Sequence, residues 1–208
     1  MNNLVVNNIK FPEFTGIRCN MMPFIQGDSS SLPDIYKPYA KIINDNYLEK
    51  GEVGLLTIDE RIVEAGKSQR GYNSFGINRN VHIEVGRHEK INCWGGGGSS
   101  WGGKLKTVLE DETMALISNS ISDTCRLWDT KEMSYTKDGD LSAYIDKYPT
   151  EKGILLKSGE VAKISIFTPH ECINQQQSSK RQFFRIVGKG IKGREDYFTI
   201  NPIIDYFN

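Results

Sequence analysis

Two histidines and one glutamate lie in sequence contexts that favour metal binding. His82 lies in the strand-like run NVHIEVG, and Glu84 follows it two residues later. Successive side chains of a strand point to opposite faces, so this imidazole and this carboxylate share one face. His170 closes the apolar run KISIFTPHE, where a strand would leave the core. Two imidazoles and one carboxylate form a triad that leaves positions open on Fe(II), so we predict a metal site at His82, Glu84 and His170.

The same residue types also permit interpretations without a metal. A His-x-Glu pair arises often by chance, and an isolated histidine is commonly a surface residue or a satisfied core residue. His88 lies in the charged turn GRHEK, and we interpret it as a surface residue. Asp123 and Asp129, within SDTCRLWD, could be rival carboxylate ligands, but turn positions are the simpler interpretation.

Two arginines follow the second histidine at regular strand spacing. Arg181 lies eleven residues beyond His170, where a strand opens, and Arg185 lies four residues further on. The two arginines therefore share a face of that strand. A guanidinium group binds a carboxylate through two parallel hydrogen bonds, which lysine cannot reproduce. An arginine facing a metal cavity would thus suit a carboxylate ligand.

The elements that must position these residues are short strands. After Gly51 the sequence breaks into short runs rich in β-branched residues and separated by Gly, Asn, Asp and Pro. We predict strands near 53–59, 80–85, 113–118, 125–128, 153–157, 161–168, 181–187 and 197–200. Eight short strands without regular βαβ alternation favour a mainly β fold, a jelly roll or barrel.

The first fifty residues have a different pattern. The first thirty, rich in Pro, Gly and Ser, are expected to form an irregular arm. A helix should follow Pro33, since Ile35, Tyr39, Ile42, Ile43 and Tyr47 recur at a spacing near 3.6 and the stripe ends before Gly51. We expect a single domain over 1–208, with the arm and helix in 1–50 and the β core in 51–208.

The order His-x-Glu, distal His and then Arg resembles that of the Fe(II)- and 2-oxoglutarate-dependent oxygenases. The resemblance extends over roughly 53–187 but depends on His82, Glu84, His170 and Arg181. It implies a double-stranded β-helix, cupin-like in shape, in which the first three residues bind Fe(II). Arg181 would receive the far carboxylate of the co-substrate 2-oxoglutarate, and Arg185 would lie near the substrate or co-substrate. The implied reaction is hydroxylation of a small molecule or an exposed side chain, with succinate as by-product.

Two features depart from the family pattern. Glu84 takes the place of the commoner aspartate, which fits a longer side chain at the metal. The segment Arg181-Gln182-Phe183 lacks the serine that often follows two positions after the arginine. One hydrogen bond to the co-substrate must then come from elsewhere, and Thr107 and Ser99 are candidates by position.

Two polar or aromatic segments could contact the substrate. Cys93 to Gly103 reads CWGGGGSSWGG, in which Trp94 and Trp101 could form a lid over a pocket or could simply pack on the barrel. Ser68 to Asn73 reads SQRGYN, and its Gln69 and Arg70 could line a substrate pocket, although loops are polar in any case.

The composition restricts partners and location. Lys plus Arg total 26 and Asp plus Glu total 26, so no global field would attract nucleic acid, which we do not favour as a partner. A local basic cluster at the C-terminal end could attract an anion or form a solvated rim; it comprises Lys180, Arg181, Arg185, Lys189, Lys192 and Arg194. The apolar runs are too short to cross a membrane. Four cysteines without CxxC spacing, and no signal peptide, predict reduced thiols in a cytoplasmic protein.

The sequence is also compatible with other functions. A cupin-like protein could hold Zn²⁺, Mn²⁺ or Fe²⁺ at the same three residues and catalyse isomerisation or hydrolysis. A metal-free jelly roll could bind a sugar or partner through its Trp/Gly loop, and modification of a nucleic-acid base is a further class. Arg181 distinguishes the oxygenase from the non-oxidative metal protein, and the sequence specifies neither the substrate nor the oligomeric state.

Overall fold

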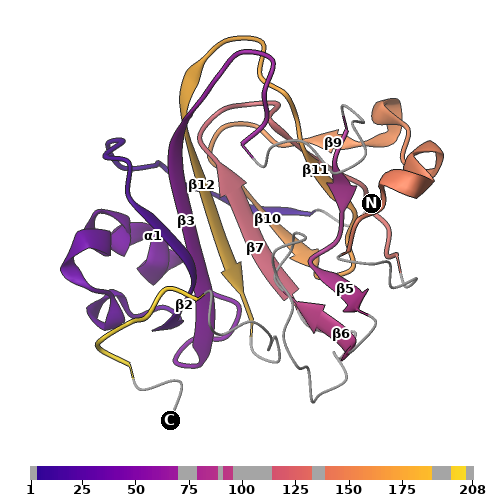
Figure 1. The fold of residues 1–208 in the computed structure, drawn as a ribbon. Helices are drawn as coiled ribbons and strands as arrows, with labels where there is room; N and C mark the ends of the chain where they lie inside the picture. Colours follow the sequence, from indigo (N-terminus) through magenta and orange to yellow (C-terminus); the bar gives the residue numbers. More distant parts are fainter. Residues whose placement is uncertain are drawn as a thin grey trace.

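The computed structural model describes residues 4–69, 79–88, 91–95, 114–132, 139–188 and 198–204, with the backbone alone for 85–88 and 91–95. The described chain is mainly β and contains two principal antiparallel sheets (Figure 1). This confirms the predicted fold class at that level. No helix in these ranges is long and apolar enough to cross a membrane.

The larger sheet has six strands in the order β1-β10-β7-β12-β3-β2. Their bounds are β1 Val5–Asn8, β2 Arg18–Ile25, β3 Val53–Val63, β7 Met114–Asn119, β10 Glu160–Ser165 and β12 Ser179–Val187. The two longest, β3 and β12, pair antiparallel from Ser179 opposite Val63 to Val187 opposite Leu55. They form the centre against which the other strands align.

The smaller sheet has four strands in the order β4-β11-β8-β9. Their bounds are β4 Val81–His82, β8 Cys125–Leu127, β9 Ile154–Leu155 and β11 His170–Cys172. A separate hairpin joins β5, Val85–His88, to β6, Ile91–Gly95. In register, His170 of β11 lies directly opposite His82 of β4, so the sheet itself brings the two histidines together.

Helical segments lie on two sides of the molecule. The 3₁₀ segments Ser29–Ser31 and Asp34–Tyr39 lead into α1, Ala40–Asp45, and Figure 1 shows this group against the outer side of the larger sheet. Two further 3₁₀ segments, Ser142–Lys147 and Thr150–Lys152, precede β9. The predicted helix is therefore confirmed only over Ala40–Asp45, because the segment before it is 3₁₀ with Pro38 inside and the chain leaves the helix at Asn46. Ile35 and Tyr47, at the two ends of the predicted apolar stripe, are exposed.

Alternation along the strands produces two hydrophobic cores. On β12, Phe183 and Val187 face one core, whereas Phe184 and Ile186 face the other. The first core draws residues from both sheets and so lies between them. The second lies between the larger sheet and the helical segments, where Tyr39 and Ile43 are fully buried. Arg181 and Arg185 have the same parity as Phe183, so both point into the space between the sheets.

Most predicted strands lie where the sequence placed them, and two predictions need correction. The strand expected over 80–85 ends at His82. The backbone amides of Ile83 and Glu84 donate hydrogen bonds to the carbonyl oxygens of Gly139 and Ile166, and not to β11. In 198–200, the described part of the strand expected at 197–200, there is no strand. That segment instead runs towards Pro202, which has no N–H to extend a ladder.

The prediction of an irregular arm over the first thirty residues is wrong for two segments. Strands β1 and β2 lie at the two edges of the larger sheet. An edge position accommodates Pro23 inside β2, because the proline needs no partner on its outer side. Met21, at φ 47°, accompanies a register shift between Cys19 and Met22. This bulge interrupts the alternation by which a strand is recognised in a sequence.

A buried carboxylate fastens the remaining irregular part of the arm to the sheet. Glu60 of β3 accepts hydrogen bonds from the backbone amides of Thr15 and Gly16, at 2.7 and 2.6 Å. It also accepts from the hydroxyl of Tyr39 at 2.8 Å and the amide of Gln182 at 2.9 Å. Burial would raise the pKa of Glu60, but these donors together hold it below its ordinary value. The ionised carboxylate of Glu60 thus holds the arm at Thr15 and Gly16 through hydrogen bonds.

Candidate metal centre

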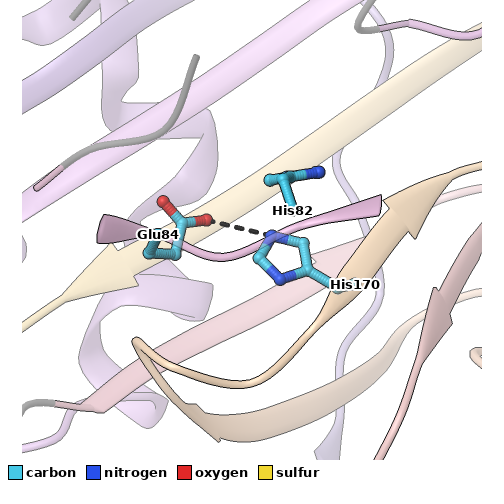
Figure 2. Close-up of side chains that lie close together, drawn as sticks. All are labelled: His82, Glu84 and His170. Atoms are coloured by element: carbon cyan, nitrogen blue, oxygen red, sulfur yellow. Dashed lines mark ion pairs between the residues drawn. The ribbon is translucent and has the colours of Figure 1, made fainter. Parts of the chain in front are cut away.

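The three predicted ligands meet between the two sheets. Ligand atoms of His82, Glu84 and His170 all lie within 4.8 Å of one another, and all three residues are buried. Figure 2 shows Glu84 and His170 facing each other, with His82 beside them. His82 ends β4, Glu84 follows two residues later, and His170 begins β11. Ligand atoms on one face of a metal, at bonds of about 2.0–2.2 Å and near right angles, are about 3 Å apart, so the farthest pair of the cluster would have to approach by up to about 2 Å on binding an ion.

Both imidazoles are oriented by backbone carbonyl groups. His82 Nδ1 lies 2.8 Å from the oxygen of Asn80, and His170 Nδ1 lies 2.9 Å from the oxygen of Thr168. A carbonyl oxygen can only accept a hydrogen bond, so each Nδ1 must carry a proton. In the neutral tautomer each Nε2 then offers a lone pair, as a metal-binding histidine requires.

The carboxylate of Glu84 is held from the opposite side by an arginine. Arg185 donates from Nη1 to Oε2 of Glu84 at 2.6 Å, and its Nη2 donates to Oγ1 of Thr57 at 3.2 Å. The other carboxylate oxygen, Oε1, lies 3.3 Å from Nε2 of His170. Glu84 therefore has one oxygen anchored and one oxygen aimed at the histidines. This is the arrangement of a monodentate ligand with an outer hydrogen-bond partner.

The neighbours of Glu84 favour its ionised form. Burial would raise the pKa of Glu84, but the charge of Arg185, the hydrogen bond from His170 and the nearby imidazoles hold it well below its ordinary value. That hydrogen bond needs a proton on Nε2 of His170 in addition to the one on Nδ1, so it belongs to the imidazolium form. In the neutral form, Nε2 of His170 and Oε1 of Glu84 are two acceptors 3.3 Å apart with no proton between them. A divalent ion would satisfy both atoms at once.

Arg181 is buried between the sheets, at 2% exposure, but is not paired with a carboxylate among the described residues. Its Nε donates to Oγ1 of Thr124 at 2.9 Å, and its Nη1 donates to Oε1 of Gln69. A guanidinium has five N–H groups, so these two bonds leave further donors on Arg181. Gln69, predicted to line a pocket, therefore contacts Arg181.

Sequence reasoning missed two residues of this arginine's surroundings. Oγ1 of Thr124 lies 2.8 Å from Oδ1 of Asn119, the last residue of β7. The amide nitrogen of Asn119 is buried without a hydrogen-bond partner in the described structure. Polar residues at a strand end and in a turn carry no signal that distinguishes them from ordinary loop residues, which is why neither was singled out.

The buried thiol of Cys125 is influenced electrostatically by Arg181 and Glu84. Burial raises the pKa of the Cys125 thiol to about 12, with Arg181 lowering it and Cys172, Glu171 and Glu84 raising it. The thiol is therefore neutral at neutral pH and is a weaker candidate ligand than the three residues of the cluster.

Several other predicted residues lie outside what the structure describes. These are Arg70, Ser99, Trp101 and Thr107, together with the side chains of His88 and Trp94. Of the predicted lid over 93–103, the structure describes only the backbone of 93–95, which forms the end of β6. Their predicted roles therefore stay predictions.

Two lesser interpretations can be assessed. Asp123 is a turn residue at φ 63° whose carboxylate pairs with Lys157 at 2.8 Å, as the turn interpretation expects. Two members of the basic cluster, Arg181 and Arg185, are not part of a solvated rim, because they are buried between the sheets. Three others, Lys189, Lys192 and Arg194, lie outside the described residues. Alternation along β12 turns both arginines inward, away from Lys180.

Comparison with known proteins gives no relative. The chain matches no protein-family description, no curated protein and no solved structure.

Proposed function

We propose that this protein is a non-haem Fe(II)- and 2-oxoglutarate-dependent oxygenase that hydroxylates a small molecule or an exposed side chain. The observation that carries the proposal is the cluster of His82, Glu84 and His170, with each Nδ1 directed at a backbone carbonyl oxygen and the carboxylate anchored by Arg185. Two imidazoles and a carboxylate on one face of a metal leave room for a bidentate oxoacid and O₂.

The strand order supports a double-stranded β-helix. The eight strands β3, β4 and β7 to β12 divide into two rows, β3-β12-β7-β10 and β4-β11-β8-β9. Consecutive strands mostly cross from one row to the other, as in a jelly roll built from two Greek keys. Strands β1 and β2 extend the first row at its two edges. In this arrangement His82, at the end of β4, and His170, at the start of β11, come from neighbouring strands of the second row.

The residues divide the work between metal and co-substrate. Bound Fe(II) would supply the redox chemistry that couples decarboxylation of 2-oxoglutarate to succinate with hydroxylation of the substrate. His82, Glu84 and His170 would hold the ion, and Arg185 would keep Glu84 charged and oriented. Arg185 is thereby committed to the ligand set, which leaves Arg181 as the carboxylate receptor on the same face of β12.

Arg181 fits a receptor for three reasons. It is buried, where a guanidinium without an anionic partner is costly, so a carboxylate ligand would relieve that cost. Its described partners are neutral, namely Gln69 and Thr124. The unpartnered amide of Asn119, one hydrogen bond beyond Thr124, could supply the donor that the missing serine would have given.

A cupin-like metal protein with non-oxidative chemistry is the second candidate. One observation favours it, since Arg181 is already hydrogen-bonded within the protein through two of its nitrogens. On this alternative the arginine is structural and the metal site acts without 2-oxoglutarate. The two candidates differ in whether the metal-loaded protein binds 2-oxoglutarate.

A thermal-shift measurement with Mn²⁺ as a redox-inert substitute for Fe(II) tests this difference. We expect Mn²⁺ to raise the unfolding midpoint, and 2-oxoglutarate to raise it again only when Mn²⁺ is present. A ligand at 100 times its Kd adds about 2.7 kcal/mol, which for a chain of this size is a shift of roughly 5–10 °C. Succinate, which has no keto oxygen to chelate the metal, is the control and should give a much smaller second shift.

The other outcomes separate the alternatives. A shift with Mn²⁺ but none with 2-oxoglutarate supports the non-oxidative metal protein. No shift with Mn²⁺, Fe²⁺ or Zn²⁺ contradicts both metal-dependent functions.

A further inference from the structure

Two cysteines lie opposite each other on neighbouring strands of the smaller sheet, close to the candidate metal ligand His170. Cys125 begins β8 and Cys172 ends β11, and the two are register partners in this antiparallel pair. Both are free thiols. Cys172 has the same parity as His170, two residues earlier on β11, so its side chain lies on the same face of the sheet.

The hydrogen-bond pattern identifies the type of pair. The backbone amide of Ile173 donates a hydrogen bond to the backbone carbonyl oxygen of Thr124 at 3.0 Å. The backbone amide of Trp128 donates to the carbonyl oxygen of Pro169, also at 3.0 Å. These are the hydrogen-bonded positions of the ladder, and such positions alternate with non-hydrogen-bonded ones. Cys125 and Cys172 therefore occupy a non-hydrogen-bonded pair. In such pairs the Cα atoms are about 4.5 Å apart, within the range of about 4.4–6.8 Å that a disulfide accepts.

The two thiols differ in accessibility. Cys172 is partly exposed, whereas Cys125 is buried at 5% exposure. An external reagent would meet Cys172 first, and Cys125 would then be the only described thiol at its side. Directly opposed Cβ atoms are about 4.5–5.5 Å apart, against about 3.8 Å in a disulfide, so closing the bond must draw β11 towards β8. A bond that holds such strain is easily reduced.

We propose that Cys125 and Cys172 are a reversible redox pair that closes to a cross-strand disulfide beside the metal cluster. The thiolate of Cys172 attacks an oxidised low-molecular-weight disulfide, which gives a mixed disulfide and releases one thiol. The sulfur of Cys125, losing its proton, then attacks the sulfur of Cys172 and releases the second thiol. Two electrons pass from the protein to the reagent, and both protons leave with the released thiols. Burial of Cys125 makes the second step the slower one.

The test uses the full chain, fully reduced and freed of metal with a chelator, and then incubated with oxidised glutathione. We expect the count of free thiols to fall from four to two, with a mass loss of two hydrogens. Non-reducing digestion should yield one cross-linked peptide pair containing Cys125 and Cys172. Dithiothreitol should restore all four thiols. The bond closes a loop of roughly 50 residues, so the oxidised protein should also unfold at a higher temperature than the reduced one.

Two variants make the result specific. Cys172→Ser should abolish the cross-link, whereas Cys93→Ser should leave it intact. A reaction in the unsubstituted chain that stops at a glutathione adduct of Cys172 overturns the proposal. So does a cross-link that involves Cys19 or Cys93. Neither outcome depends on the proposed oxygenase function, because the assay contains no metal and no 2-oxoglutarate.

Discussion

His170→Ala is expected to remove metal-dependent turnover altogether while leaving the fold in place. The substitution takes away one of three ligands, and even a residue that only supports a ligand typically changes metal affinity by about 10–100-fold. We therefore expect the Kd for Fe(II) or Mn²⁺ to rise by at least about 100-fold. Binding is measured by calorimetry, turnover by succinate formation, and folding by far-ultraviolet circular dichroism.

His88→Ala is the matched control for this prediction. His88 is the last residue of β5 and lies outside the candidate cluster, so its loss should affect neither metal affinity nor turnover. If the His170 variant still bound metal and turned over, the assignment of His170 as a ligand would be wrong.

Arg181→Ala is expected to weaken 2-oxoglutarate binding by about 30-fold or more with little change in metal affinity. Removal of one partner from a buried charge pair typically costs about 2–5 kcal/mol, and about 2 kcal/mol corresponds to a 30-fold change in Kd. Calorimetry with the Mn²⁺-loaded protein measures both constants. Arg181→Lys keeps the charge but not the planar fork, so it should recover only part of the affinity.

Arg185→Ala provides the comparison within the same strand. Arg185 anchors Glu84 at 2.6 Å, so its loss should weaken metal binding first, and 2-oxoglutarate binding only as a consequence. The assignment is reversed if the Arg181 variant binds 2-oxoglutarate normally and the Arg185 variant keeps its metal but loses 2-oxoglutarate.

The sequence was sufficient to predict the cluster because two local rules coincide there. The spacing of His82 and Glu84 fixes a shared face through the two-residue period of extended chain, even though β4 itself ends at His82. His170 was recognisable because it ends an apolar run. The long strands β3 and β12 were likewise evident from their β-branched and aromatic residues.

The partner of Glu84 could not be predicted, because it depends on how distant strands are aligned. Arg181 and Arg185 have the same parity, and only the register of β12 against β3 places Arg185 opposite Thr57 and within reach of Glu84. A two-residue shift would have given a different contact without changing the sequence pattern. The edge strand β2 was missed for a local reason, since Pro23 and the bulge at Met21 conceal its alternation.

The most direct test of the proposed centre is the visible absorption spectrum of the purified protein with Fe(II) under anaerobic conditions. A 2-oxoglutarate molecule chelating Fe(II) at His82, Glu84 and His170 should give a weak charge-transfer band. We expect this band only when Fe(II) and 2-oxoglutarate are both present, and we expect it to be lost in His170→Ala. A protein that binds Fe(II) but shows no band at saturating 2-oxoglutarate would contradict the oxygenase, and a protein that binds no Fe(II) would contradict the metal centre itself.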